Sequence, residues 1–178
     1  MLFDYNLLFL CIDFSKIVTL EYVKMGGTLQ IDSLDKKIIK LITQNARIPY
    51  LEVARECNVS GAAIHQRIQK LTNLGVITGS KFTIEPKKVG YKTCAYMGIF
   101  LEQASLYNSV LEELRKIPEI TQCHFTTGNY SVFIKIFAHD NEHLKSVLTD
   151  KIQVIPGIAR TETFISLEVS FNRSVPID

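Results

Sequence analysis

The chain has 178 residues, and its 47% hydrophobic and 21% charged residues are typical of folded globular protein rather than of a disordered tail. At roughly 100–200 residues per domain, one or two domains fit this length. The 4 cysteines form no CxxC pair, which argues against a disulfide framework and a zinc ribbon. No apolar run approaches the ~18 residues of a membrane span. We therefore expect a cytoplasmic protein with no metal, cofactor or membrane partner.

Charge is distributed unevenly along the chain. Residues 29–92 contain 11 Lys and Arg against 5 Asp and Glu, whereas residues 93–178 contain 7 against 10. A basic N-terminal module suits a polyanionic partner, and a mildly acidic C-terminal module suits a different task.

Residues 1–28 fit neither module. The stretch 1–24 is apolar, but Asp4 stands where a signal peptide carries basic residues, and Met25 offers a second start. We interpret residues 1–24 as a start-site artefact or an accessory extension.

Residues 29–84 contain three stretches with helical spacing of apolar residues, followed by a hairpin pattern. Asp32 or Ser33 can cap the first helix, and Gly75 can end the third. This order predicts a winged helix-turn-helix. We expect the second helix over 50–57 with Leu51 and Ala54 inward, the third over 60–74 with Ile64, Ile68 and Leu71 inward, and hairpin strands at Val76–Ile77 and Phe82–Ile84.

The third helix has the composition of a DNA-reading helix. Its outer side carries small residues near the N-terminus, amide side chains and no acidic residue. A helix in the major groove needs close approach, amides that read base edges and no carboxylate facing phosphates. Gln66 and Gln69 suit adenine edges, and Arg67 suits a phosphate; the alternative is an ordinary solvated face. The expected DNA contacts are Ser60, Gly61, Ala62, His65, Gln66, Arg67, Gln69 and Lys70.

Residues 93–172 follow the order strand, helix, strand, strand, helix, strand, which predicts a ferredoxin-like βαββαβ domain. The expected elements are a strand over Thr93–Glu102, a helix capped by Ser105 and ended by Pro118, strands over Thr121–Thr126 and Tyr130–Ala138 joined at Gly128-Asn129, a helix capped by Asp140 and closed by Pro156-Gly157, and a strand over Ile158–Phe171.

Three of these strands carry apolar residues on both faces. Both helices cover one face of such a sheet, so the other face would be an exposed apolar patch in a monomer, and a symmetric dimer would cover it. One set is Ala95, Ile99, Val132, Ile134, Ile136, Ile165 and Leu167, and the other is Tyr96, Phe100, Phe133, Phe137 and Phe164.

The predicted fold class is therefore α+β. A winged helix-turn-helix domain (29–84), a linker (85–92), a ferredoxin-like effector and oligomerisation domain (93–172) and a tail (173–178) follow the extension (1–28).

Several motifs in both halves resemble the Lrp/AsnC, or feast/famine, family of bacterial transcriptional regulators. They are IDSLD (31–35), NAR (45–47), RIQKL (67–71), GVI (75–77), TTGNYS (126–131) and PGI (156–158). The resemblance implies a DNA-binding regulator that assembles from homodimers, often into octamers, and binds an amino-acid effector between dimers.

One position of the TTGNYS motif indicates a branch of the family. The family usually has Asp where this chain has Ser131, and together with FIK (133–135) and KIQ (151–153) this is similar to the asparagine-responsive AsnC branch. The resemblance then implies control of asparagine synthesis genes. Hydroxyls and a glycine suit a small amphoteric ligand, although Thr on strands is also common. The expected effector contacts are Thr126, Thr127, Gly128, Asn129, Tyr130, Ser131, Thr161 and Thr163.

Two other functions share part of this pattern: an RNA-binding RRM has the same strand order, and an amino-acid-sensing module of an enzyme has the same ligand-sensing role. An RNA-binding RRM needs a basic sheet and an RNP1 motif, whereas residues 130–137 read YSVFIKIF. An amino-acid-sensing module of an enzyme complex, without DNA binding, stays open as the alternative. No catalytic motif or catalytic residue is present, and His139 and His143 lack a third metal ligand nearby in sequence.

Overall fold

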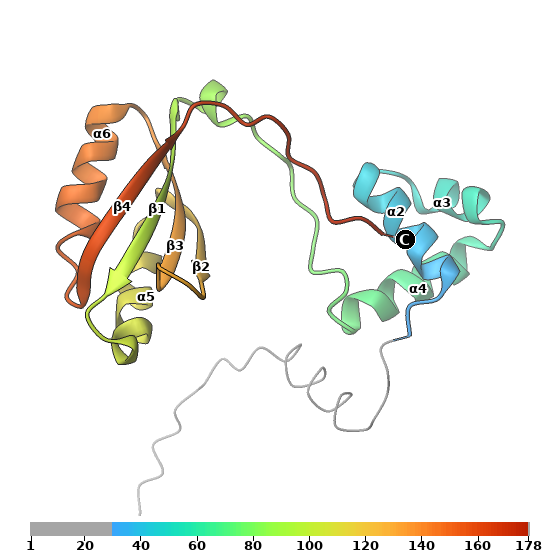
Figure 1. Ribbon diagram of the computed structural model, residues 1–178. Coiled ribbons are helices and arrows are strands. Elements are labelled where there is room, and N and C mark those ends of the chain that lie inside the picture. Colours follow the sequence, from blue (N-terminus) through green and yellow to red (C-terminus); the bar gives the residue numbers. More distant parts are fainter. Residues whose placement is uncertain (1–29, 178) are drawn as a thin grey trace, which may run out of the picture. The chain divides into compact units, whose positions relative to one another are not determined.

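The computed structural model describes residues 30–177, so the predicted extension at 1–24 lies outside the described residues (Figure 1). The chain divides into two compact units. Of the described residues, the first comprises 30–82 together with 173–177, and the second comprises Thr83–Asn172. None of the helices in residues 30–177 is both long and apolar enough to cross a membrane.

The first unit contains the three expected helices: α2 (Ser33–Gln44), α3 (Tyr50–Cys57) and α4 (Gly61–Asn73). Asp32 caps α2 in a reciprocal capping box with Asp35, and the Ser60 hydroxyl accepts from the Ala63 N–H at 3.2 Å. A tight turn with a left-handed residue joins α3 to α4. The fully buried core side chains of this unit are Ile38, Val53, Ala54, Ile64 and Leu71.

The inward face of α3 differs from the prediction. Val53 and Ala54 are buried, whereas Leu51 is 67% exposed. At about 100° per residue, Leu51 lies about 200° around the helix from Val53, so both cannot face the same core. The prediction for Leu51 was wrong.

The expected hairpin after α4 is also absent. Gly75 ends the helix with φ of 69°, as predicted, but residues 74–85 contain no strand. Phe82 is 71% exposed, and its ring lies under the Arg47 guanidinium at 4.4 Å. An isolated two-stranded hairpin is marginally stable, and apolar residues this exposed give it no layer on which to pack.

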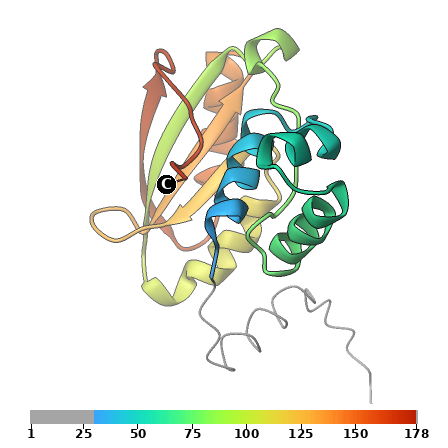
Figure 2. The same cartoon turned by 90° about the vertical axis from the view of Figure 1, so that its right-hand side faces the viewer.

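The second unit is a four-stranded antiparallel sheet in the order β2-β3-β1-β4 (Figure 2). This order is that of a ferredoxin-like fold. Its elements are η1 (Pro86–Val89), β1 (Thr93–Leu101), η2 (Ala104–Leu106), α5 (Tyr107–Arg115), β2 (Ile120–Phe125), β3 (Val132–Ala138), α6 (Asn141–Ser146), the π-helical η3 (Val147–Ile152) and β4 (Ile158–Ser166).

The two helices cover one face of the sheet and leave the other open. Ile99, Val132 and Ile134 are buried with α5 and α6, whereas on the opposite face the aromatic rings contact one another and the ring of Tyr130. In this register the open face carries Tyr96, Gly98, Phe100, Phe133, Lys135, Phe137, Arg160, Glu162 and Phe164.

Several boundaries in this unit differ from the prediction. Ser105 caps no helix, because the turn η2 precedes α5. The β2–β3 connection spans residues 126–131 rather than two residues, and β4 ends at Ser166 rather than at Phe171. Ile165 and Leu167 belong to the same predicted set as the buried Ile99 and Ile134 but are 52% and 92% exposed, because β4 is the edge strand and ends before Leu167.

Candidate DNA-reading and effector sites

The outer surface of α4 has the properties expected of a DNA-reading helix. Ile64 and Leu71 anchor its inner face, and the residues on the other side are exposed. Gly61 packs closely, since a Cβ there would lie 3.2 Å from Leu51 Cδ2. Within residues 30–177 the Gln66 amide makes no hydrogen bond, so its donors and acceptor are available to a base edge. The exposed residues are Ala62, His65, Gln66, Gln69 and Lys70.

Neighbouring side chains orient two of these residues. The Gln69 Nε2 donates to Asn73 Oδ1 at 2.9 Å, and the Gln69 carbonyl oxygen has no hydrogen-bond donor among the described residues. The rings of Tyr50 and His65 meet edge to face with centroids 5.1 Å apart. Tyr50 is itself 40% exposed, so α3 contributes an aromatic side chain to the same surface, which sequence reasoning missed.

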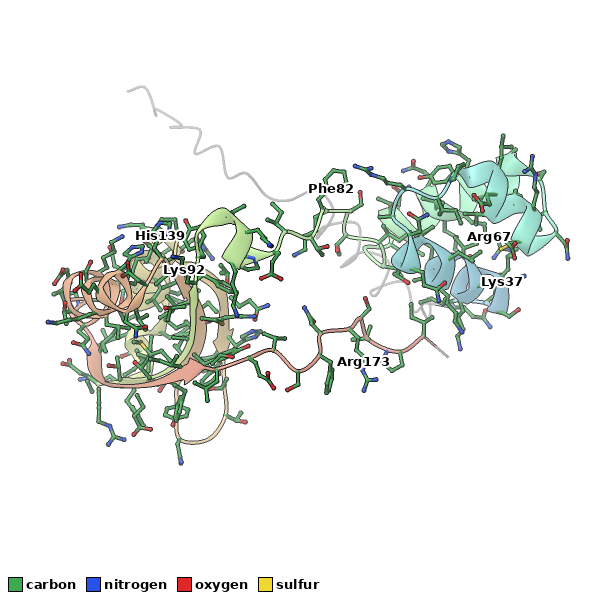
Figure 3. All side chains as sticks on the ribbon, turned by 90° about the horizontal axis from the view of Figure 1, so that it is seen from above. Lys37, Arg67, Phe82, Lys92, His139 and Arg173 are labelled. Atoms are coloured by element: carbon green, nitrogen blue, oxygen red, sulfur yellow. The ribbon has the colours of Figure 1, made fainter. Side chains whose placement is uncertain are left out.

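Arg67, the predicted phosphate contact, pairs with acidic side chains of its own unit. Its guanidinium lies between α4 and the start of α2 (Figure 3), where it donates to Asp32 and, at 2.9 Å, to Asp35. Asp35 is fully buried, and Lys70 Nζ lies 3.6 Å from its second oxygen. The hydrogen bond from Arg67 lowers the pKa of Asp32, and the same bond raises the pKa of Arg67. Arg67 therefore fixes α4 against α2 and neutralises the two carboxylates nearest the reading helix.

Residues 126–131 form a compact loop whose tip is open. The Thr126 hydroxyl donates to the Tyr130 carbonyl at 2.7 Å, and the Thr126 N–H donates to the Ser131 carbonyl at 3.1 Å. Thr127, Gly128 and Asn129 are exposed, and Gly128 has φ of 108° with open space around it. Few side chains adopt this backbone conformation, so glycine is required at the tip.

Tyr130 connects this loop to the open face of the sheet. Its ring lies on Gly98, where a Cβ would come within 2.3 Å of Tyr130 Cδ1. Its hydroxyl donates to Glu162 Oε2 at 2.7 Å, and this bond raises the pKa of Tyr130. Sequence reasoning missed Gly98 and Glu162, although a glycine inside a strand signals a close approach.

The structure does not bring Thr161 and Thr163 beside the loop. Thr161 pairs with Ile99, whose other neighbour is Val132, so two strand spacings, about 10 Å, separate β4 from the end of the loop. The Thr161 hydroxyl accepts from Gln153 Nε2 at 3.1 Å on the helical side of the sheet.

No group of three metal-ligating side chains lies together within residues 30–177. His139 and His143 stack with ring centroids 4.9 Å apart. His143 Nδ1 faces the backbone N–H of His139 and its Nε2 faces Glu119, so both ring nitrogens are already engaged.

Known proteins match both units. Residues 31–78 match the winged helix-turn-helix DNA-binding family, and residues 94–176 match the Lrp/AsnC ligand binding domain. The regulatory protein AsnC of Haemophilus influenzae is 42% identical over 82% of this chain and 97% of its own. The structure of Escherichia coli AsnC is 39% identical, with a TM-score of 0.79 over 82% of this chain and 98% of its own. An L-Met complex of a transcriptional regulator from Neisseria meningitidis has a TM-score of 0.79 over 84% of this chain and 98% of its own, but at 18% identity it supports the fold alone.

A winged helix-turn-helix DNA-binding domain followed by an Lrp/AsnC ligand binding domain, in a chain similar to regulatory proteins, describes a regulator of transcription and not an enzyme. The chain belongs to the Lrp/AsnC family of DNA-binding transcriptional regulators.

Proposed function

We propose that this protein senses asparagine and, through it, controls genes of asparagine metabolism from the cytoplasm. The observation that carries the proposal is the 39–42% identity to proteins named AsnC over almost their whole length. The match of residues 94–176 to the Lrp/AsnC ligand binding domain supports a small-molecule effector. Asparagine in particular is favoured by the polar, uncharged loop tip at Thr127–Asn129 with Ser131 behind it, because an amide side chain needs neutral donors and acceptors.

The DNA contacts in this proposal come from α4 and its surroundings. Gln66 and Gln69 read base edges, and Lys70 contributes positive charge beside them. His65, oriented by Tyr50, lies on the same surface. Ser60, Gly61 and Ala62 allow close approach at the start of the helix. Arg67 supports the surface from behind rather than contacting a phosphate.

The effector contacts come from the loop and not from β4. Thr126, Thr127, Gly128, Asn129 and Ser131 would hold the amino acid, with Tyr130 fixing the loop against the sheet. Thr161 and Thr163 are placed too far from the loop to share one small ligand within a protomer, so they would contribute only across an interface between protomers.

We further propose that the open face of the sheet joins two copies of this chain. Its aromatic rings are only half-buried, and two cations lie over them: Lys135 Nζ is 5.1 Å from the Phe137 centroid and Arg160 Cζ is 4.0 Å from that of Phe100. In a two-fold symmetric dimer, the open face of one copy would pack against the same face of the other. A dimer would also present two α4 helices to half-sites about 34 Å apart, and dimers would then assemble further.

Effector binding would act by shifting populations between assemblies. A ligand that binds one assembly more tightly than another favours it, and the arrangement of the α4 helices then changes with it.

Two measurements test these proposals. In scanning fluorimetry against all twenty amino acids, asparagine should raise the melting temperature most, because a ligand selective for the folded protein stabilises it. No shift with asparagine, or an equal shift with every amino acid, would contradict the assignment. In sedimentation velocity, Phe164→Asp should dissociate the dimer, whereas Val154→Asp, also on an exposed apolar residue of this unit, should leave it intact.

A further inference from the structure

The second unit holds a pocket at the end of the β2–β3 pair that is opposite the effector loop. Its volume is about 330 Å³, within the range of sites for small molecules. Five residues of β3 separate the two ends, about 17 Å at 3.3 Å per residue. The walls are mainly apolar, with two polar residues, and come from residues 84–91, from the turn before β2, from β2 and from β3. They include Ile84, Val89, Tyr91, Phe137, Glu119 and Thr121.

Glu119 is a buried carboxylate, and one of its two oxygens has no hydrogen-bond partner among the described residues. The residue is only 9% exposed, and its Oε1 accepts from Lys151 Nζ at 2.7 Å and faces His143 Nε2 at 3.2 Å. The second oxygen, Oε2, is buried without a hydrogen-bond partner in the part of the chain that the structure describes. A buried acceptor of this kind is costly unless a donor meets it.

The partners of Glu119 leave it ionised. The His139 N–H donates to His143 Nδ1 at 3.2 Å, so the proton of a neutral His143 is on Nε2 and points at Glu119. Burial is the largest single influence and acts to raise the pKa of Glu119, but the hydrogen bonds from Lys151, the backbone and His143, together with the charge of Lys151, outweigh it, so the pKa lies below its ordinary value. Lys151 pairs with Oε1, so Oε2 has no charged or hydrogen-bonding partner among the described residues.

The other polar group of the pocket is also an acceptor. The Thr121 hydroxyl directs its hydrogen at the Lys135 carbonyl, 3.4 Å away, so only its lone pairs remain. A pocket that offers acceptors and a carboxylate selects a donor with positive charge and disfavours a ligand carboxylate. The rings of Tyr91 and Phe137 add faces that attract a cation or stack on an aromatic body.

The linker side of the pocket is held by a separate set of contacts. Tyr91 stacks on His139 with centroids 4.4 Å apart, His139 Nδ1 lies 3.1 Å from the Gly90 carbonyl, and the Lys92 N–H donates to the His139 carbonyl (Figure 3). These contacts hold the Tyr91 ring in position at the side of the pocket without a bound ligand.

We propose that this pocket is a second ligand site, distinct from the effector loop, which binds a small primary ammonium compound with an apolar or aromatic body. The ammonium group donates to Glu119 Oε2 and Thr121, and the body fills the space between Tyr91, Val89 and Phe137. Because Oε2 is buried, this contact requires the Glu119 side chain to turn toward the pocket.

The test compares three probes of one shape by calorimetry on the full chain: phenethylamine, neutral 2-phenylethanol and the anion phenylacetate. We expect saturable binding of the amine, at least about tenfold tighter than the alcohol, and none of the anion. Glu119→Gln should remove that preference. Val89→Trp should fill the pocket and abolish binding, whereas Lys88→Trp, one residue earlier and outside the lining, should bind as wild type does.

Three outcomes would overturn the proposal: no saturable binding of the amine, equal binding of amine and alcohol, or unchanged binding by Glu119→Gln. Binding of the amine by the monomeric Phe164→Asp variant alone would also overturn the proposal. It would mean that, in the dimer, a lysine of the second copy occupies the pocket. The asparagine response of Val89→Trp should be unchanged, so failure here is distinguishable from failure of the effector assignment.

Discussion

Gly98→Ala should destabilise the second unit through a single contact, the ring of Tyr130. The added Cβ would lie 2.3, 2.5 and 2.5 Å from three ring atoms, whereas carbon atoms pack at about 3.5–4.0 Å. The ring must therefore withdraw by more than about 1 Å, which breaks the 2.7 Å hydrogen bond from Tyr130 to Glu162 unless Glu162 follows. Overpacking of this kind costs about 1–3 kcal/mol. For a unit of this size, 2 kcal/mol corresponds to a melting temperature lower by roughly 8–16 °C.

The assay is a double-mutant cycle in urea, with Tyr130→Ala as the second change. Once the ring is removed, Gly98→Ala should be neutral or stabilising by about 0.5 kcal/mol, because alanine loses less backbone entropy than glycine in a strand. Gly98 does not have positive φ, so the backbone itself accepts alanine. An equal loss of stability in both backgrounds would refute the reasoning.

Three further predictions concern the two sites. Gln66→Ala should relax base preference at one operator position by about 1–3 kcal/mol, measured by competition between operator variants; an equal loss on random DNA would refute a reading role. Gly128→Val should abolish the asparagine response and spare dimerisation, and unchanged asparagine binding in calorimetry would remove Gly128 from the site. The lowered pKa of Asp32 means that its pairing with Arg67 stabilises the fold above the unfolded pKa of about 4 and is lost as the pH falls through the folded value. Asp32→Asn should therefore show a smaller loss of stability in acid than wild type, by thermal melts from pH 7 to pH 2.

Matched controls separate these effects from general damage. Gln44→Ala changes an exposed glutamine at the end of α2 and should leave base preference unaltered. Asn129→Ala, next to Gly128 in the same exposed loop, keeps the backbone conformation possible and should weaken the response less than Gly128→Val.

The elements of both units were predictable because each has a strong local signal. Asp32, Ser60 and Asp140 cap helices through short side chains, and each caps the helix that the sequence indicated. The alternation of apolar residues in β1 and β3 likewise gave the two faces of the sheet.

What the sequence could not supply depends on contacts between distant residues. Arg67 looked like a phosphate ligand because the buried Asp35, 32 positions earlier, gives no local sign of facing it. The expected hairpin at Phe82 has residues typical of strands, but Phe82 and Ile84 are exposed, so in the described residues no second layer covers them. The ion pair of Glu119, in the turn before β2, with Lys151 of η3 joins residues 32 positions apart, so no local pattern indicates the unpartnered second oxygen of Glu119.

Titration of a labelled promoter duplex with the purified protein, followed by anisotropy across salt concentrations, tests most directly whether this protein binds DNA in response to asparagine. We expect an affinity that falls steeply with salt, as phosphate contacts require, and that changes when asparagine is added. No binding of any promoter duplex at any salt concentration, with or without amino acids, would contradict this.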